Sequence, residues 1–208
     1  SVPGPNNSIL SGGGATGDAD LSAILAAQTP PVTGTLNNAT KLEFDFVAVT
    51  NQINFNFLFA SEEYGVYQCG FSDAFAFILT DLTAATPPTN IAVLPGTNVP
   101  VSIFNIRDNQ YNVACPSSNL AYFGNYYNNT QGIIGAPIDF NGITVPMTAG
   151  ATVIPGNSYH IKMVIADYND TAYDSAVFLQ GGSFNPGDNG CTDKIKLIAF
   201  NDTNNNGI

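Results

Sequence analysis

The sequence of 208 residues contains few charged side chains, and most of those it has are acidic. Asp, Glu, Lys and Arg make up 10% of the residues, against about a quarter in ordinary globular domains. Sixteen acidic and five basic residues give a formal net charge of −11. A surface of this sign repels nucleic acid and anionic lipid. We therefore expect no nucleic-acid partner, whereas cations, calcium above all, should be attracted.

Long apolar runs and catalytic motifs are also missing. No stretch is apolar for long enough to cross a membrane as a helix, so we expect no direct membrane insertion. The chain has no Trp and a single His, His160, and it contains no G-x-S-x-G motif. The single His, on a predicted strand where it alternates with Lys162, gives no basis for a Ser–His–acid or Cys–His arrangement, and we expect a non-enzymatic protein.

Most of the sequence that is present reads as short β-strands. Asn, Thr, Ser and Gly replace the missing charges, which is typical of extracellular β proteins. Apolar side chains recur at every second position, the period of a strand with one buried face. The alternating sets are Leu42, Phe44 and Phe46; Ile53, Phe55, Phe57 and Phe59; Phe75, Phe77 and Leu79; Tyr159, Ile161, Met163 and Ile165; and Ala176 and Phe178. The pattern predicts an all-β fold, an antiparallel β-sandwich or jelly roll.

One segment departs from this strand pattern. "GDADLSAILAAQ", residues 17–28, looks helical, and Asp18 or Asp20 is placed to cap its first turn. We expect at most one short helix, near residues 18–27.

The chain has three cysteines, Cys69, Cys115 and Cys191, and no C-x-x-C pair that would favour zinc. In an exported protein the simplest arrangement is one disulfide and one odd cysteine. We favour a Cys69–Cys115 disulfide, which leaves Cys191 without a partner in this chain. Three free, inert thiols are the alternative.

Two groups of acidic residues fall in loops between predicted strands. Glu62, Glu63 and Asp73 lie around the loop that follows residue 61, and Asp167, Asp170 and Asp174 lie in a much later loop. Loops gather at the ends of a sandwich, so the two groups could converge. Several carboxylates in one place repel one another unless a cation lies among them. Hard oxygen ligands without a nearby His or thiol pair favour calcium.

Two other interpretations of these acids stay open. Acid pairs in loops are often merely solvated, and Asp174 could simply cap a turn. Paired carboxylates also hydrolyse glycosides, but such enzymes usually line their clefts with aromatic rings, and this chain has no Trp.

An aromatic segment, "AYFGNYYNN" at residues 121–129, is a second candidate site. Tyr122, Tyr126, Tyr127 and Asn128 could form a platform for a sugar, because rings offer apolar faces while hydroxyls and amides bind sugar hydroxyls. A packed loop with partly buried tyrosines explains the same residues.

Six blocks together resemble a known family. They are "LEFDFV", "FLFASEEYG", "FSDAFAFIL", "NIAVLPGTNVPVSI", "GITVPMTA" and "YHIKMVIADYNDTAYDSAVFLQGGSF". In this order they resemble the choice-of-anchor L domain of bacterial surface and secreted proteins, over residues 17–184. The resemblance implies an extracellular, β-rich module of a larger protein, and it implies no particular chemistry. Members usually carry further strands upstream, so this domain either lacks its N-terminal strands or receives them from elsewhere.

The last residues resemble a different family. "FNDTNNNGI" is similar to the start of the calcium-stabilised B-type repeats of bacterial surface adhesins. Asp202, Asn204 and Asn206 stand at alternate positions before Gly207, as in the first half of a calcium loop. We therefore expect a domain over residues 1–190, and a linker with the first strand of a following repeat over residues 191–208.

These observations predict a calcium-stabilised module of a bacterial adhesin or surface filament, outside the cell. Its expected partners are a glycan or protein ligand and the neighbouring domains of the same chain. A carbohydrate-binding module is the alternative, and a glycoside hydrolase is a remote one.

Overall fold

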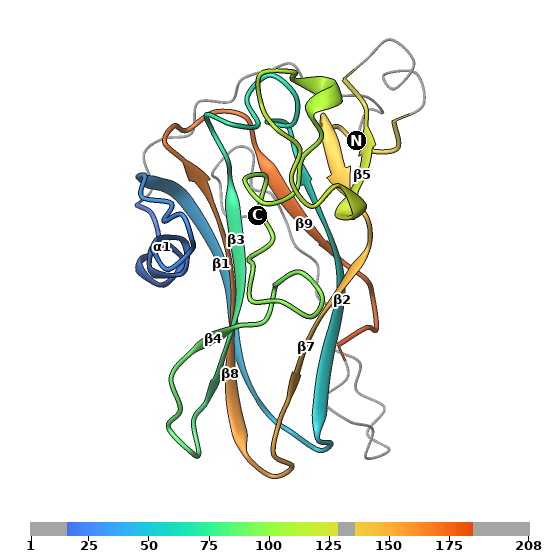
Figure 1. Ribbon diagram of the computed structural model, residues 1–208. Coiled ribbons are helices and arrows are strands. Elements are labelled where there is room, and N and C mark those ends of the chain that lie inside the picture. The colour runs from blue at the N-terminus through green and yellow to red at the C-terminus, as the bar shows by residue number, and fades with distance from the viewer. Residues whose placement is uncertain (1–15, 129–135, 185–208) are drawn as a thin grey trace, which may run out of the picture.

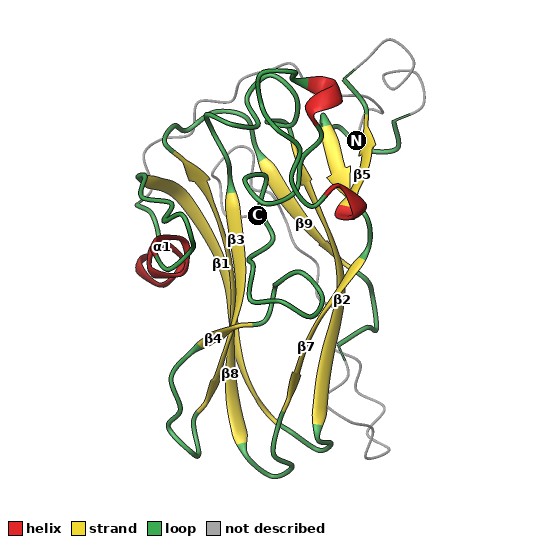
Figure 2. Ribbon diagram, viewed as in Figure 1, coloured by secondary structure: helices red, strands yellow, loops and turns green. Residues whose placement is uncertain are grey.

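The computed structural model describes residues 16–128 and 136–184 of the chain. Figure 2 shows that strands and loops make up most of this part. The elements are α1 (Ala19–Ala26), β1 (Leu36–Val47), β2 (Gln52–Ser61), β3 (Ala74–Asp81), β4 (Thr89–Asn90), the 3-10 turns Asn109–Tyr111 and Leu120–Tyr122, β5 (Phe123–Tyr126), β6 (Gly142–Thr144), β7 (Met147–Thr152), β8 (Ser158–Tyr168) and β9 (Ser175–Leu179).

The strands form two antiparallel sheets that face each other (Figure 1). The first has the order β1-β8-β3-β4, and the second has the order β5-β6-β2-β7, with β9 also paired to β2. The predicted all-β sandwich with one short α-helix is confirmed. The chain passes repeatedly between the sheets, so elements far apart in sequence meet at the same end of the sandwich.

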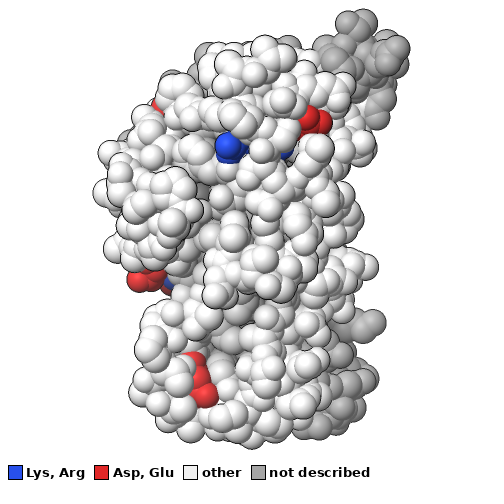
Figure 3. All heavy atoms as spheres, in the orientation of Figure 1, with Lys and Arg blue, Asp and Glu red and all other residues white. Residues whose placement is uncertain are grey.

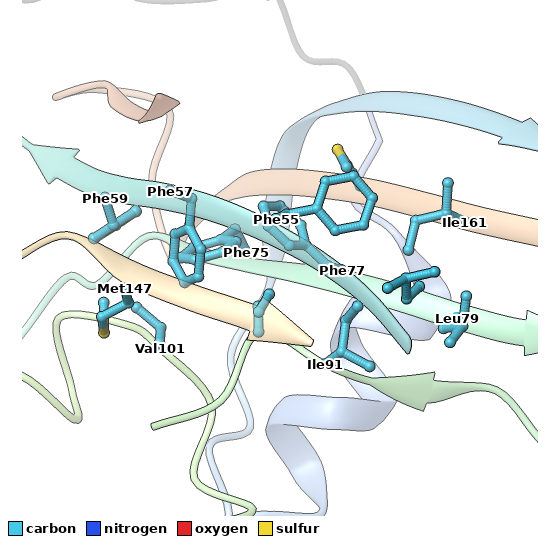
Figure 4. Packing of buried hydrophobic residues seen from close by; sticks show 14 of the residues in the cluster. Phe55, Phe57, Phe59, Phe75, Phe77, Leu79, Ile91, Val101, Met147 and Ile161 are labelled. Atoms are coloured by element: carbon cyan, nitrogen blue, oxygen red, sulfur yellow. The ribbon is translucent and has the colours of Figure 1, made fainter. Parts of the chain in front are cut away.

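The core between the sheets is dominated by phenylalanine. Phe57 and Phe59 of β2 face Phe75 and Phe77 of β3, as Figure 4 shows. Phe59 stacks on Phe75 with ring centroids 5.2 Å apart, and Phe57 meets Phe77 edge-on at 5.2 Å. Alternation along β2 and β3 places these rings on the inner faces of both sheets, as their spacing predicts.

The first sheet is also covered on its outer face, by α1. Leu21 and Leu25 of the helix pack with Ala76 and Ile78 of β3. Burial on both faces explains why β3 is apolar at nearly every position. The Asp18 side chain caps the helix and, with Asp20, binds Lys162 of β8 at 2.6 and 2.7 Å. This ion cluster, in which Asp18 and Lys162 are buried and Asp20 is exposed, was not expected from the sequence.

One predicted strand face is wrong. The alternation of Ala176 and Phe178 placed these side chains in the core, but the Phe178 side chain is 40% exposed, and Val177 packs against the core instead. The cause is the register, which pairs Val177 with Phe59 of β2. Directly paired residues of antiparallel strands share a face, so the inward-facing Phe59 turns Val177 inward.

Candidate functional site

The predicted acidic residues meet at one end of the sandwich. The end of β2 lies beside the start of β9, where Ser61 pairs with Ser175, and the start of β3 lies beside the end of β8, where Ala74 pairs with Ala166. The β2–β3 loop and the β8–β9 loop therefore leave the sheets at the same end (Figure 1). The two groups of acids, about a hundred residues apart in sequence, are brought together here.

Glu62 is bound to the β8–β9 loop. Its side chain is 2% exposed, and its carboxylate accepts a hydrogen bond from the backbone N–H of Asp174 at 3.2 Å. Its own N–H donates to the Asp174 carbonyl at 3.1 Å, and the Asn141 side-chain amide donates to its carbonyl. Burial, followed by the charges of Asp174 and Asp139, raises the pKa of Glu62 to about 8.

Glu63 contacts the start of β3 and not the β8–β9 loop that Glu62 contacts. It is fully buried, and its Oε2 accepts the N–H of Asp73 at 2.8 Å. Asp73 is also fully buried, and its Oδ1 accepts the N–H of Tyr168 at 3.3 Å. Glu63 thus joins the start of β3, and Asp73 joins the end of β8.

The remaining acids line the β8–β9 side. Asp167 is 9% exposed, and its Oδ2 accepts a hydrogen bond from the Asn38 side chain at 2.9 Å. Asp170 and Asp174 are half-buried. The Asp170 carbonyl is held by the Asn37 side chain at 2.8 Å, and its Oδ1 accepts the N–H of Ala172 at 3.3 Å.

Burial and repulsion by neighbouring acids disfavour the charged forms of Glu63, Asp73 and Asp167. Burial, then the charges of Asp170 and Asp167, raises the pKa of Glu63 to about 8. Burial, then the charges of Glu63 and Asp167, raises the pKa of Asp73 well above its ordinary value. Burial, then the charges of Asp174 and Asp170, raises the pKa of Asp167 to about 6. Each of these groups therefore needs a proton or a cation to be stable where it lies.

Two carboxylate oxygens of these three residues are buried without any hydrogen-bond partner: Glu63 Oε1 and Asp73 Oδ2. The Ser175 hydroxyl lies near Asp73 and favours its ionised form, but it makes no hydrogen bond of ordinary geometry. Buried polar atoms are nearly always paired in proteins, so these oxygens require an explanation. As the side chains stand, no three His, Cys, Asp or Glu residues within the described ranges are grouped to hold a metal ion.

The predicted disulfide is confirmed. Cys69 in the β2–β3 loop is bonded to Cys115, with Cα atoms 5.8 Å apart. The same loop is held by the buried Gln68, which donates to the Asp108 carbonyl at 2.9 Å. The loop that carries Glu62 and Glu63 is thereby fastened to residues 108–115. Cys191 lies outside the described residues.

The aromatic candidates are partly packed. The Tyr126 ring stacks on Tyr111 with centroids 4.1 Å apart, and its hydroxyl is close to Asn128. Tyr122 and Tyr126 pack against the core, and Tyr122, Tyr127 and Asn128 are half-buried. One face of Tyr126 is therefore occupied by another ring.

Several polar side chains that support the site were missed by sequence reasoning: Asn38, Asn141 and Ser175. Asn141 stands before Gly142, a pair that signals a turn but not a contact with the Glu62 carbonyl. The predicted ligands Asp202, Asn204 and Asn206 lie outside the described residues, so that loop stays a prediction.

The comparison with protein families identifies the chain. The sequence model of the choice-of-anchor L domain matches residues 1–185. The chain belongs to the choice-of-anchor L domain family. No match was found among curated proteins or among solved structures. The match ends at residue 185 and gives no support to the predicted B-type repeat beyond it.

Membership in the choice-of-anchor L family indicates a non-catalytic domain of a secreted or surface protein. Within residues 16–128 and 136–184, no helix is both long enough and apolar enough to span a membrane. Figure 3 shows few charged side chains on the face that it displays, in keeping with the composition.

Proposed function

We propose that this choice-of-anchor L domain is a non-enzymatic, calcium-stabilised module of a bacterial adhesin or surface filament, serving attachment or structural extension. The observation that carries the proposal is the Cys69–Cys115 disulfide, which bonds the β2–β3 loop to the segment between β4 and β5. Disulfides persist outside the cytosol and are rare within it, so this bond and the family both support an exported module.

The placement of the polar residues supports a binding or structural role over catalysis. Glu62 and Glu63 are both buried, and each accepts a backbone N–H from a different segment, so they are not arranged as a pair on either side of a scissile bond. His160 lies seven residues before Asp167 on β8 and contacts Asp45 at 2.7 Å. The remote glycoside hydrolase alternative therefore gains no support from this arrangement.

Calcium belongs to this proposal as the stabilising ion. It accepts six to eight oxygen ligands in a tolerant geometry, and extracellular modules commonly bind it with dissociation constants of about 0.1–1 mM. The raised pKa values of Glu63 and Asp73 indicate where such an ion would relieve the repulsion between carboxylates. A thermal melt in calcium and in chelator tests this part, and equal melting temperatures would contradict it.

A carbohydrate-binding module is the second candidate, favoured by the half-buried Tyr122, Tyr127 and Asn128 beside the stacked Tyr126. An array of surface glycans probed with the oxidised domain separates the candidates: retention of a defined glycan supports this one. Antibody labelling of intact producing cells tests the location. Labelling before permeabilisation is expected, and labelling only afterwards would contradict a surface module.

A further inference from the structure

The acid cluster is divided into two halves by the different partners of Glu62 and Glu63, the two residues that follow β2. Glu62 lies with Asp174 in the outer half, where its carboxylate already has a backbone partner in the β8–β9 loop. Glu63 lies with Asp73 in the inner half, where both side chains are fully buried and each carboxylate has one oxygen without a hydrogen-bond partner, and Asp167, 9% exposed, lies at its rim. The two halves therefore differ in their hydrogen bonding.

The inner half has open coordinating positions. Each buried carboxylate uses one oxygen for a backbone N–H: Glu63 Oε2 for Asp73, and Asp73 Oδ1 for Tyr168. The second oxygen of each, Glu63 Oε1 and Asp73 Oδ2, is buried and has no hydrogen-bond partner. The backbone contacts fix both carboxylates against each other, and the open oxygens remain for a ligand.

We propose that one calcium ion binds in the inner half, coordinated by Glu63 and Asp73, with Asp167 completing the carboxylate set on the side of the β8–β9 loop. This inference rests on the calcium part of the proposed function and assigns its ligands. Three carboxylates around one divalent ion would convert mutual repulsion into attraction. Glu62 is excluded from the set and serves as a backbone anchor for the β8–β9 loop.

The ligand chemistry favours calcium over other ions. The inner half offers carboxylates and the nearby Ser175 hydroxyl, and the confirmed disulfide removes two thiols from consideration. Zinc prefers nitrogen and sulfur ligands in a tetrahedron, and magnesium requires a near-ideal octahedron and retains its waters. Calcium accepts irregular oxygen sets completed by carbonyls and water.

Binding requires a local adjustment of side chains. The acids of the described residues do not form a complete metal cage as they stand. Asp167 is the group best able to move, because it is 9% exposed and a single Asn38 amide holds its Oδ2. The expected change is a rotation of this side chain toward Glu63 and Asp73, while the two buried carboxylates keep their backbone partners.

The ion would connect three segments at the end of the sandwich where the β2–β3 and β8–β9 loops lie. Glu63 belongs to the β2–β3 loop, Asp73 precedes β3, and Asp167 lies near the end of β8. The β2–β3 loop is in turn bonded through Cys69 to Cys115. Calcium would therefore connect the β2–β3 loop to β3 and β8, while the disulfide connects the same loop to Cys115.

The test compares thermal melting in calcium and in chelator for the oxidised chain and its variants. Calcium at about 100 times its dissociation constant should raise the wild-type melting temperature by roughly 5–10 °C. Glu63→Gln and Asp73→Asn should lose this shift. In chelator each should melt no lower than the wild type, because the amide removes a repelled charge while keeping an oxygen for the backbone N–H. Glu62→Gln, the matched control, should retain the shift.

Each outcome decides a different claim. A wild type that does not respond to calcium contradicts the proposed function and this inference together. A wild type that responds, with Glu63→Gln and Asp73→Asn responding equally, overturns only the ligand assignment. Loss of the response in Glu62→Gln as well overturns the division into two halves. If the buried variants fail to fold by circular dichroism, Asp167→Asn, at the rim, decides: its calcium affinity should fall at least about 10-fold, and an unchanged affinity would overturn the assignment.

Discussion

Removal of the Cys69–Cys115 disulfide should lower the free energy of unfolding by about 4 kcal/mol. The two cysteines are 46 residues apart in sequence. Cross-linking a loop of this length restricts the unfolded chain, and the chain-entropy relation gives about 4 kcal/mol at 25 °C, between roughly 3 for 15 residues and 4.7 for 100. The loss is large beside the total stability of about 5–15 kcal/mol that is usual for domains.

The assay is urea unfolding of a Cys69→Ala/Cys115→Ala double variant, followed by circular dichroism because the chain has no Trp. Both proteins should carry Cys191→Ser, so that a free thiol cannot exchange with the disulfide. The urea concentration at the unfolding midpoint should fall. The slope of the unfolding free energy against urea concentration should increase if the chain without the disulfide unfolds to a more expanded state.

A loss below about 1 kcal/mol would refute this reasoning. It would mean that residues 69–115 remain compact in the unfolded chain, so that the bond restricts little. It would also weaken the case that the domain depends on an oxidising compartment.

Three further predictions concern the core, a turn and the helix cap. Phe59→Ala should cost about 3–5 kcal/mol of unfolding free energy in urea titrations, and Phe178→Ala, at a 40% exposed position, should cost far less; similar losses would contradict the assigned face of β9. Gly65→Ala should lower the melting temperature, because Gly65 has φ +91° and a Cβ there would collide with the Tyr126 hydroxyl. An unchanged melting temperature would contradict this reasoning. Burial would raise the pKa of Asp18, but the hydrogen bond and charge of Lys162 and the capping N–H groups outweigh it and lower the pKa. The stability that Asp18 contributes is therefore present above pH of about 4 and lost as pH falls through its lower folded pKa, so melts from pH 6 to 2 should show the wild type losing its advantage over Asp18→Asn; a constant difference would argue against the ion cluster.

The fold was predictable where the sequence carries strong local periodicity. The phenylalanines of β2 and β3 alternate with smaller or polar residues, so both strands and their inner faces followed from spacing alone. The face of β9 did not, because Ala176, Val177, Phe178 and Leu179 are apolar in succession and show no alternation. Pairing with β2 decides that face, and pairing is not visible in a local pattern.

The candidate site was predictable in outline for a similar reason. Loops at one end of a sandwich gather, so Glu63 and Asp167 could be expected to approach each other. Which segment each of Glu62 and Glu63 contacts depends on the pairing of Ser61 with Ser175, and the sequence does not show this. The ion cluster of Lys162 with Asp18 was missed because its members are far apart in the chain.

The most direct test of the calcium-stabilised module is a high-resolution crystal structure of the oxidised domain grown with calcium. The predicted result is one ion about 2.3–2.6 Å from Glu63 Oε1 and Asp73 Oδ2, with Asp167 turned toward it and Glu62 still bonded to the Asp174 N–H. Inner carboxyls that hydrogen-bond to one another with no ion between them would contradict the proposal, because protons alone would then neutralise the cluster.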